Sequence, residues 1–408
     1  AREFPGLGSG AGVIANRLFH AAGYYVPEDF VLEFDADRLV IDPEAREENP
    51  ELTEGLVREM LAWTAEIAPG RYRGLASKFV PGTPKGPFEF EGHWGDDPND
   101  HYEHQYRREL RGLLVVAAWL NHVDLRFANT LDVYIDPPGY IRHYLIDFAS
   151  SLGSSAGLRS HTPRHGREYQ VDVWPTVFRF ATLGLWQSGW ESEEFEPIHP
   201  SIGWLRAESY DPDEWKPGWP NRAFLSMSER DGYWGAKLVA SFTDEQIRAA
   251  VDAGRLPAAP ADTLVEILIH RRDETVRHWF ARVTPLERPA VTPVGDAGAL
   301  RVEFDDLGMA KGLWTAAGTR YAWTFRHPVR ELERSGAFDA AEGARQEFLI
   351  ELSGGAEPAA ADRALALEDR LATLEIRSPR AGAGERPATL YLDWDPATGR
   401  YTLAGLIH

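Results

Sequence analysis

Two stretches decide the fold expected for this chain: "NHVDLRFANTLDVY" at 121–134 and "RHYLIDFASSLG" at 142–153. Each places one acid next to a run of apolar residues, Asp124 in the first stretch and Asp147 in the second. The first stretch also carries Asn129, five residues after its acid. Three oxygen-bearing side chains at the ends of buried elements favour a functional site over simple packing.

The sequence around these stretches predicts a helix followed by a hairpin. Apolar residues at helical spacing over 110–120 indicate a buried helix that ends near Asn121. The alternating segments 130–135 and 140–148, joined by the turn "DPPG", predict two antiparallel strands. The hairpin would bring the region of Asp147 back toward the loop that follows the helix.

The composition sets limits on the class of protein. At 43% hydrophobic, with 14 Trp, 14 Tyr and 19 Phe, the 408 residues can build a sizeable core. The formal charge of −20 opposes binding to nucleic acid, which we do not expect as a partner. The absence of Cys excludes disulfides and thiolate ligands. No apolar run reaches the roughly 20 residues of a membrane span.

The spacing of the candidate residues has a physical logic in phosphoryl transfer. The first stretch reads H-x-D followed by x4-N, and an Asp-Phe pair follows one hairpin later. In this chemistry a carboxylate orients the attacking hydroxyl, and a nearby Asn and a second Asp hold Mg²⁺ on the nucleotide phosphates. An Asp or Asn at a helix end is also a common cap, so each residue alone has a structural interpretation.

The motifs resemble those of the protein-kinase-like superfamily. "HVDLRFAN" is similar to the catalytic loop H-R-D-L-x-x-x-N, and "IDFAS" is similar to D-F-G. The resemblance implies that Asp124 is the catalytic base and that Asn129 and Asp147 are metal ligands, binding Mg²⁺ and thereby ATP. It also implies that Arg126 neutralises charge near the γ-phosphate and that His122 organises the loop. The acceptor, a protein or a small molecule, stays open.

The sequence departs from ordinary protein kinases. Ala149 stands in place of the Gly of D-F-G, Val123 replaces the Arg of H-R-D, and no A-P-E follows. The chain looks closer to atypical bacterial kinases of the spore-coat, toxin and aminoglycoside phosphotransferase branches. The motifs themselves lie within 107–150.

The expected fold class is α+β, with a kinase-like fold followed by a small all-β, sandwich-like domain. The kinase-like domain would span 1–285, with an N-lobe-like part at 1–90 and a C-lobe-like part at 91–285. A Pro-rich linker is predicted at 286–295. The alternating segments of 296–408 predict the β-rich domain.

The N-terminal part lacks one expected feature. Kinases place a nucleotide-binding Lys on a strand before the first long helix, and no Lys precedes Lys78 here. Lys78 in "ASKFV" could take that role, the N-lobe could be degenerate, or the strand could lie upstream of residue 1. We favour the upstream strand, because "VIANRLFHAA" at 13–22 already predicts the helix that would follow it.

Two other functions stay open. A kinase-fold binding module without catalysis is the first, and a metal-dependent hydrolase centred on His101, His104, His122 and Asp124 is the second. The chain begins with Ala rather than Met, which suggests an exported bacterial protein, although ATP is scarce outside the cytosol. Localisation is therefore unresolved.

Three further stretches have competing interpretations. The basic stretch 150–167 could cover the site or bind an anion, or be a plain loop. The stretch 92–104 is interpreted as a turn that opens a helix at Tyr102 rather than as a metal site. The Trp-rich region 174–234 is interpreted as packing rather than as a sugar platform.

Overall fold

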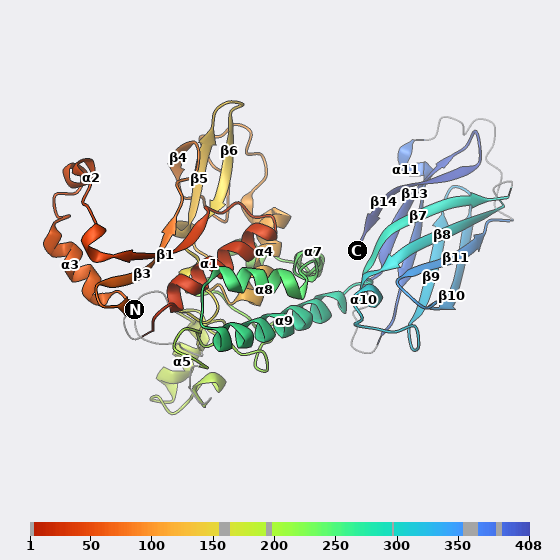
Figure 1. Cartoon of the computed structure of the whole chain (residues 1–408). Helices are drawn as coiled ribbons and strands as arrows, with labels where there is room; N and C mark the ends of the chain where they lie inside the picture. The colour runs from red at the N-terminus through yellow and green to blue at the C-terminus, as the bar shows by residue number, and fades with distance from the viewer. Residues whose placement is uncertain (1–3, 155–163, 193–197, 296–297, 354–365, 381–385) are drawn as a thin grey trace. The chain divides into compact units, whose positions relative to one another are not determined.

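The computed structural model describes residues 4–154, 164–192, 198–295, 298–353, 366–380 and 386–408. Helices and strands both occur along the chain, which is an α+β protein (Figure 1). It divides into two compact units, the first made of Ala1–Ser228 with Lys237–Thr275 and the second of Glu229–Ala236 with Val276–His408.

The first unit is mainly helical, with two small sheets. Its helices are α1 (Leu7–Ala21), α2 (Pro43–Glu48), α3 (Glu54–Trp63), α4 (Arg108–Leu120), α5 (Val173–Ala181), α6 (Arg222–Leu225) and α8 (Asp244–Ala253), and residues of α7 (Glu229–Ala240) and α9 (Ala258–Phe280) occur in both units. Its strands are β1 (Asp29–Asp35), β2 (Glu66–Ala68), β3 (Arg71–Ser77), β4 (Thr83–Gly86), β5 (Thr130–Ile135) and β6 (Tyr140–Leu145). They form the antiparallel sheets β1-β3-β2 and β4-β5-β6.

Helix α1 begins earlier than the sequence predicts. The sequence predicted a helix over 13–22, but the helix starts at Leu7, directly after Gly6. The glycines inside the helix permit close packing. A Cβ on Gly12 would lie 2.6 Å from a methyl carbon of Leu75, and one on Gly10 would lie 2.8 Å from a methyl carbon of Leu256. Glycine therefore allows α1 to approach β3 and the end of α8, at a cost in helix propensity.

Helix α4 and the hairpin that follows it confirm the buried helix and the two antiparallel strands that the sequence predicts. The second half of α4 is buried, and the helix ends at Asn121 in the left-handed conformation, with φ 46°. Strands β5 and β6 pair in register from Thr130 with Leu145 to Ile135 with Tyr140. Strand β6 is shorter than predicted, so Asp147 lies two residues beyond its end.

Arg271 of α9 fixes the C-terminal end of α4. Its buried guanidinium donates hydrogen bonds to the carbonyl oxygens of Ala118 at 2.6 Å and Trp119 at 2.9 Å. These carbonyls belong to the last turn of the helix, where the backbone leaves acceptors unpaired and a cation is stabilised by the helix dipole. The loop that starts at Asn121 therefore leaves a firmly held helix end.

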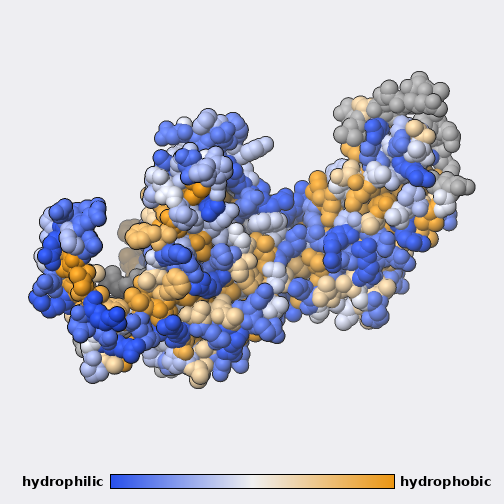
Figure 2. Space-filling model, turned by 45° about the horizontal axis from the view of Figure 1, so that its top comes forward, coloured by the Kyte–Doolittle hydropathy of each residue, from blue (hydrophilic) through white to orange (hydrophobic). Residues whose placement is uncertain are grey.

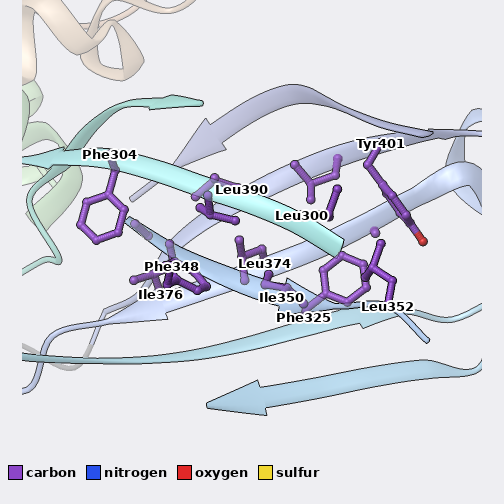
Figure 3. Packing of buried hydrophobic residues seen from close by; sticks show 14 of the residues in the cluster. Leu300, Phe304, Phe325, Phe348, Ile350, Leu352, Leu374, Ile376, Leu390 and Tyr401 are labelled. Atoms are coloured by element: carbon purple, nitrogen blue, oxygen red, sulfur yellow. The ribbon is translucent and has the colours of Figure 1, made fainter. Parts of the chain in front are cut away.

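The second unit contains two antiparallel sheets that share one core. Its strands are β7 (Leu286–Val294), β8 (Ala299–Asp306), β9 (Arg320–His327), β10 (Leu332–Asp339), β11 (Arg345–Glu351), β12 (Leu371–Arg377), β13 (Ala388–Asp395) and β14 (Arg400–Ile407), with short helices α10 (Leu307–Ala310) and α11 (Leu367–Arg370). The sheet orders are β11-β8-β7 and β10-β9-β12-β13-β14. Figure 3 shows side chains of both sheets in the core, among them Phe304, Ile350, Phe325, Leu374 and Leu390.

The segment 286–295, which the sequence suggested as a Pro-rich linker, forms most of strand β7. Pro is tolerated there because β7 lies at the edge of its sheet. The pairing with β8 also shifts register between Glu287 and Ala290, around Pro289. The edge position and the irregular register accommodate a residue that lacks a backbone N–H.

The helices of the described residues were compared with the length and hydropathy of a membrane span. Within the described ranges, every helix is too short or too polar to cross a membrane. Hydrophobic residues do gather on the surface of α3 (Figure 2), where Met60 and Trp63 are largely exposed.

Candidate active site

The loop after α4 is anchored by a cluster of three aromatic rings in edge-on and tilted contacts. His122 is buried, and its ring centroid lies 5.4 Å from that of Phe19 on α1 and 5.3 Å from that of Phe148. Its Nδ1 lies 2.9 Å from the hydroxyl oxygen of Ser151. Burial lowers the pKa of His122 to about 4, so the ring is neutral near pH 7. His122 therefore joins α1, the loop and the segment after Asp147.

The candidate base and the candidate amide ligand are held by the same loop. The Asn129 Nδ2 donates a hydrogen bond of 2.8 Å to the backbone carbonyl of Asp124. Because a carbonyl can only accept, this contact fixes which way the amide faces. The amide oxygen of Asn129 is thereby left as the atom available to a ligand. The Asp124 carboxylate lies 3.0 Å from the Arg126 Nε, and both side chains are partly exposed.

Asp147 is brought to this loop by the backbone. The N–H of Ile146 donates a 3.1 Å hydrogen bond to the carbonyl of Asn129. The next residue, Asp147, has φ 59° and ψ 73°, a left-handed conformation that is uncommon outside glycine. The turn breaks the strand direction, and the Asp147 side chain is exposed. Two hydrogen bonds thus join Asn129 to Asp124 and to Ile146, the residue before Asp147.

Asp147 lines a cavity of about 820 Å³ in the first unit. Its wall includes the first turn of α1, the ends of β1 and β3, and the apolar side chains of Leu131 and Ile146. Lys78 also lines this cavity, but its ammonium lies 3.8 Å from the Glu28 carboxylate and its side chain is 70% exposed. Asp124, Arg126 and Asn129 are not part of the cavity lining, although Asn129 is two residues from Leu131.

Sequence reasoning missed one acid at this site, Asp29 at the start of β1. Its side chain lines the cavity, is buried, and accepts a 2.6 Å hydrogen bond from Ser77. Burial raises the pKa of Asp29, and the negative charge of Asp147 raises it further, against the opposing effects of Ser77 and Arg17. An acid that opens a predicted strand, in "PEDFVLEF", was the available signal.

The residues present fit a hard divalent cation. Mg²⁺ prefers oxygen ligands from one or two carboxylates or amides and keeps several waters. The oriented amide oxygen of Asn129 and the exposed carboxylate of Asp147 are of this kind. Of the residues that the structure places, no three His, Asp or Glu side chains form a metal-holding group. The site would therefore depend on a bound nucleotide for further oxygen ligands.

Two of the three histidines considered for a hydrolase, His104 and His122, make contacts with other parts of the first unit. His104 is buried, with Nδ1 2.6 Å from the carbonyl of Glu89 and Nε2 2.8 Å from the Asp100 carboxylate. His122 is used in the aromatic cluster, and His101 is exposed. Asp100 also accepts from the backbone of Trp94, which holds 94–104 as a closed turn.

The helix predicted to open at Tyr102 begins at Arg108 instead, because Asp100 binds His104 rather than capping a helix. Residues 155–163 of the basic stretch 150–167 lie outside the described residues, so its predicted role is open. At the near end of that stretch, Ser150 accepts a 3.2 Å hydrogen bond from the backbone of Val123.

Comparison of the sequence with protein-family models and with curated proteins finds no match.

Proposed function

We propose that the protein is an ATP- and Mg²⁺-dependent phosphotransferase of the atypical kinase type. The observation that carries the proposal is the orientation of Asn129, whose amide nitrogen is held by the Asp124 carbonyl while its backbone is bonded to the residue before Asp147. The candidate base and one candidate metal ligand thus share a hydrogen bond, and the second candidate ligand, Asp147, directly follows the bonded Ile146. Phosphoryl transfer depends mainly on such positioning and on charge neutralisation.

The cavity beside Asp147 suits a nucleotide. Its volume of about 820 Å³ is within the range of small-molecule sites. Leu131 and Ile146 provide an apolar surface for a base, and Arg73 and Lys78 provide positive charge. Residues Gly6 to Ser9, in the first turn of α1, also line it, and a helix N-terminus favours phosphate oxygens.

The chemistry follows from the positions of Asp124 and Arg126. The Asp124 carboxylate would accept a hydrogen bond from the acceptor hydroxyl and take its proton as the oxygen attacks the γ-phosphorus. A new P–O bond forms, the bond to the β-phosphate oxygen breaks, and ADP leaves. Arg126, 3.0 Å from Asp124, would hold the carboxylate and counter the charge that develops. Bound Mg²⁺ would neutralise the phosphates.

Paired substitutions test the proposal on the full chain. Asp147→Asn should abolish Mg²⁺-dependent ATP binding measured by calorimetry. Asp124→Asn should keep that binding and lower ADP release by at least about a hundredfold, the scale of acid–base catalysis. The matched control is Asp136→Asn, an exposed acid in the turn of the same hairpin. Binding of Mg·ATP that is unchanged in Asp147→Asn would contradict the proposal.

A binding module without catalysis is the second candidate. The pairing of Lys78 with Glu28 favours it, because this cation faces a surface acid. That function predicts Mg·ATP binding by the native protein without ADP release under any acceptor supplied.

A further inference from the structure

A second cavity in the first unit, of about 910 Å³, is lined by Asn121, where the candidate catalytic loop begins. Most of its aromatic lining comes from the Trp-rich stretch that the sequence suggested was only packing. The rings that line it are Tyr169, Trp186, Trp190, Trp204, Tyr210 and Trp215. A cavity of this volume has the dimensions of a ligand site.

Four aromatic rings of this cavity already carry a cation from the protein, one of them Trp186, whose ring centroid lies 5.6 Å from the Arg179 guanidinium. The Arg271 guanidinium lies 3.7 Å from the ring centroid of Tyr210, and Arg167 lies 5.1 Å from that of Trp204. Lys216 lies 5.4 Å from the ring centroid of Tyr169. A cationic ligand would meet like charge at these faces. The lining therefore disfavours a cationic ligand, and the exposed carboxylates of Asp211 and Glu214 disfavour an anionic one.

The polar lining requires a ligand that both donates and accepts hydrogen bonds. The indole nitrogen of Trp190 and the Nδ1 of His165 are buried, and neither has a hydrogen-bond partner within the described ranges. An indole N–H can only donate, so it needs an acceptor. The exposed carboxylates of Asp211 and Glu214 line the same cavity and can accept further hydrogen bonds, although Asp211 already accepts one from the backbone of Asp213. Hydroxyl groups supply both.

The cavity adjoins the loop of Asp124. Trp215 donates a 2.9 Å hydrogen bond to the Asn121 side chain, and a Cβ on Gly166 would lie 2.5 Å from the same Asn121 oxygen. His165 responds to the loop as well: burial and Arg164 lower its pKa, while the charge of Asp124 raises it. A hydroxyl bound beside His165 would lie on the side of the cavity nearest Asp124.

We propose that this cavity binds the acceptor and that the acceptor is a neutral ring compound with several hydroxyl groups, of the sugar type. Its C–H faces would lie on the indole rings of Trp190 and Trp215, and its hydroxyls would pair with Trp190, His165 and Asp211. The inference rests on the proposed function for the transfer step. In that step a ligand hydroxyl oxygen bonds to the γ-phosphorus of ATP, its proton passes to Asp124, and ADP is released with a sugar phosphate.

Binding can be tested without nucleotide, by saturation-transfer NMR and calorimetry on the full chain. The probes are glucose, N-acetylglucosamine and myo-inositol. We expect at least one to bind and Trp190→Phe, which keeps the ring but removes the N–H, to weaken it roughly fivefold, the effect of one hydrogen bond. His165→Leu should weaken it as well. Trp219→Phe is the control, because Trp219 lines a separate groove beside Arg126.

The outcomes separate the two proposals. Absence of binding by all three probes, or binding that is weakened by Trp219→Phe and not by Trp190→Phe, overturns the cavity assignment. Binding that depends on Trp190, together with absence of ADP release when ATP, Mg²⁺ and the same probe are present, supports the cavity as a sugar site and overturns the phosphotransferase. ADP release that depends on both Trp190 and Asp124 supports both.

Discussion

Two residues of the candidate site adopt a left-handed backbone conformation, which Asn and Asp tolerate better than other non-glycine residues. Asn121 has φ 46° and Asp147 has φ 59°, one at the start of the loop and the other after the hairpin. Non-glycine residues in this region cost of order 1–3 kcal/mol and persist where surrounding contacts hold them. Here Trp215 holds Asn121, and the hydrogen bond from Ile146 to Asn129 precedes Asp147. Both turns redirect the chain where the candidate ligands lie.

Substitution of Asp147 should separate stability from nucleotide binding. The charge of Asp147 disfavours ionised Asp29, whose pKa it raises. Asp147→Asn removes this repulsion, and Asn tolerates a positive φ. We therefore expect the free energy of unfolding without metal to stay equal or rise by less than about 1 kcal/mol. Urea unfolding measures it, and a clear loss of stability would contradict this account of the site.

The protonation of His122 should make the first unit sensitive to acid. The folded ring takes a proton only near pH 4, whereas an unfolded His does so near 6.5. Stability should thus be complete above about pH 6.5 and fall as the pH drops toward 4, by about 2 kcal/mol at pH 5. The measurement is the free energy of unfolding at pH 7 and pH 5.

The control for this pH effect comes from the second unit. Burial also lowers the pKa of His327 to about 4. His122→Gln should remove the acid sensitivity of the first unit only, and His327→Gln that of the second only. An unchanged pH dependence in His122→Gln would refute the assignment.

At the scale of elements, the end of α4 determines where the loop begins. Arg271 is bonded to Ala118, Trp119 and Arg206 through their backbone carbonyls. Burial is the main cause that lowers the pKa of Arg271, to about 10. The guanidinium is therefore still charged at neutral pH. The cation is stabilised by carbonyl dipoles at a helix end. The tip of α4 therefore depends on a residue more than one hundred positions away in sequence.

Arg271→Met should destabilise the first unit strongly. The change removes the Arg271 donor from the carbonyl oxygens of Trp119 and Arg206, while Ala118 keeps the N–H of Asn121, and each unpaired group costs about 1–3 kcal/mol. We expect a loss of at least about 3 kcal/mol in urea unfolding, with weaker Mg·ATP binding because the loop shifts. Arg248→Met is the matched control: its ion pair with Asp262 is exposed, so the loss should stay below about 1 kcal/mol.

Local patterns predicted several elements well. The hairpin was predicted from alternation and its turn, and the end of the buried helix near Asn121 from the apolar periodicity of 110–120, as the structure has them. Prediction failed where contacts with residues distant in the sequence determine the local structure. The early start of α1 depends on Leu75 and Leu256, which pack on its glycines. Such long-range contacts leave no periodic signal in the sequence.

At the scale of the molecule, the two units have separate cores. That of the second unit is formed by the facing sheets around Phe325, Ile350 and Leu374. Leu374→Ala should cost about 3 kcal/mol, as expected for a fully buried Leu. Calorimetry should then show the transition of this unit shifted down and that of the first unit unchanged. A common shift of both transitions would mean that the units unfold together.

The candidate site was predictable only in part. The residue types of Asp124, Asn129 and Asp147 follow from motif spacing, and their connection needs two hydrogen bonds that only a folded loop provides. Asp29 was missed, since a single acid before a strand resembles any solvated residue. The tryptophans were interpreted as packing because hydropathy cannot separate a ring in a core from a ring on a cavity wall.

The aromatic cluster of Phe19, His122 and Phe148 couples helix α1 to the segment that carries Asp147. Phe19 belongs to α1, whose first turn lines the nucleotide-sized cavity, and Phe148 directly follows Asp147. A displacement of α1 would therefore reach the backbone beside Asp147 through the contacts among these three rings. A ligand that enters the cavity and tilts α1 would thus also change the position of Asp147.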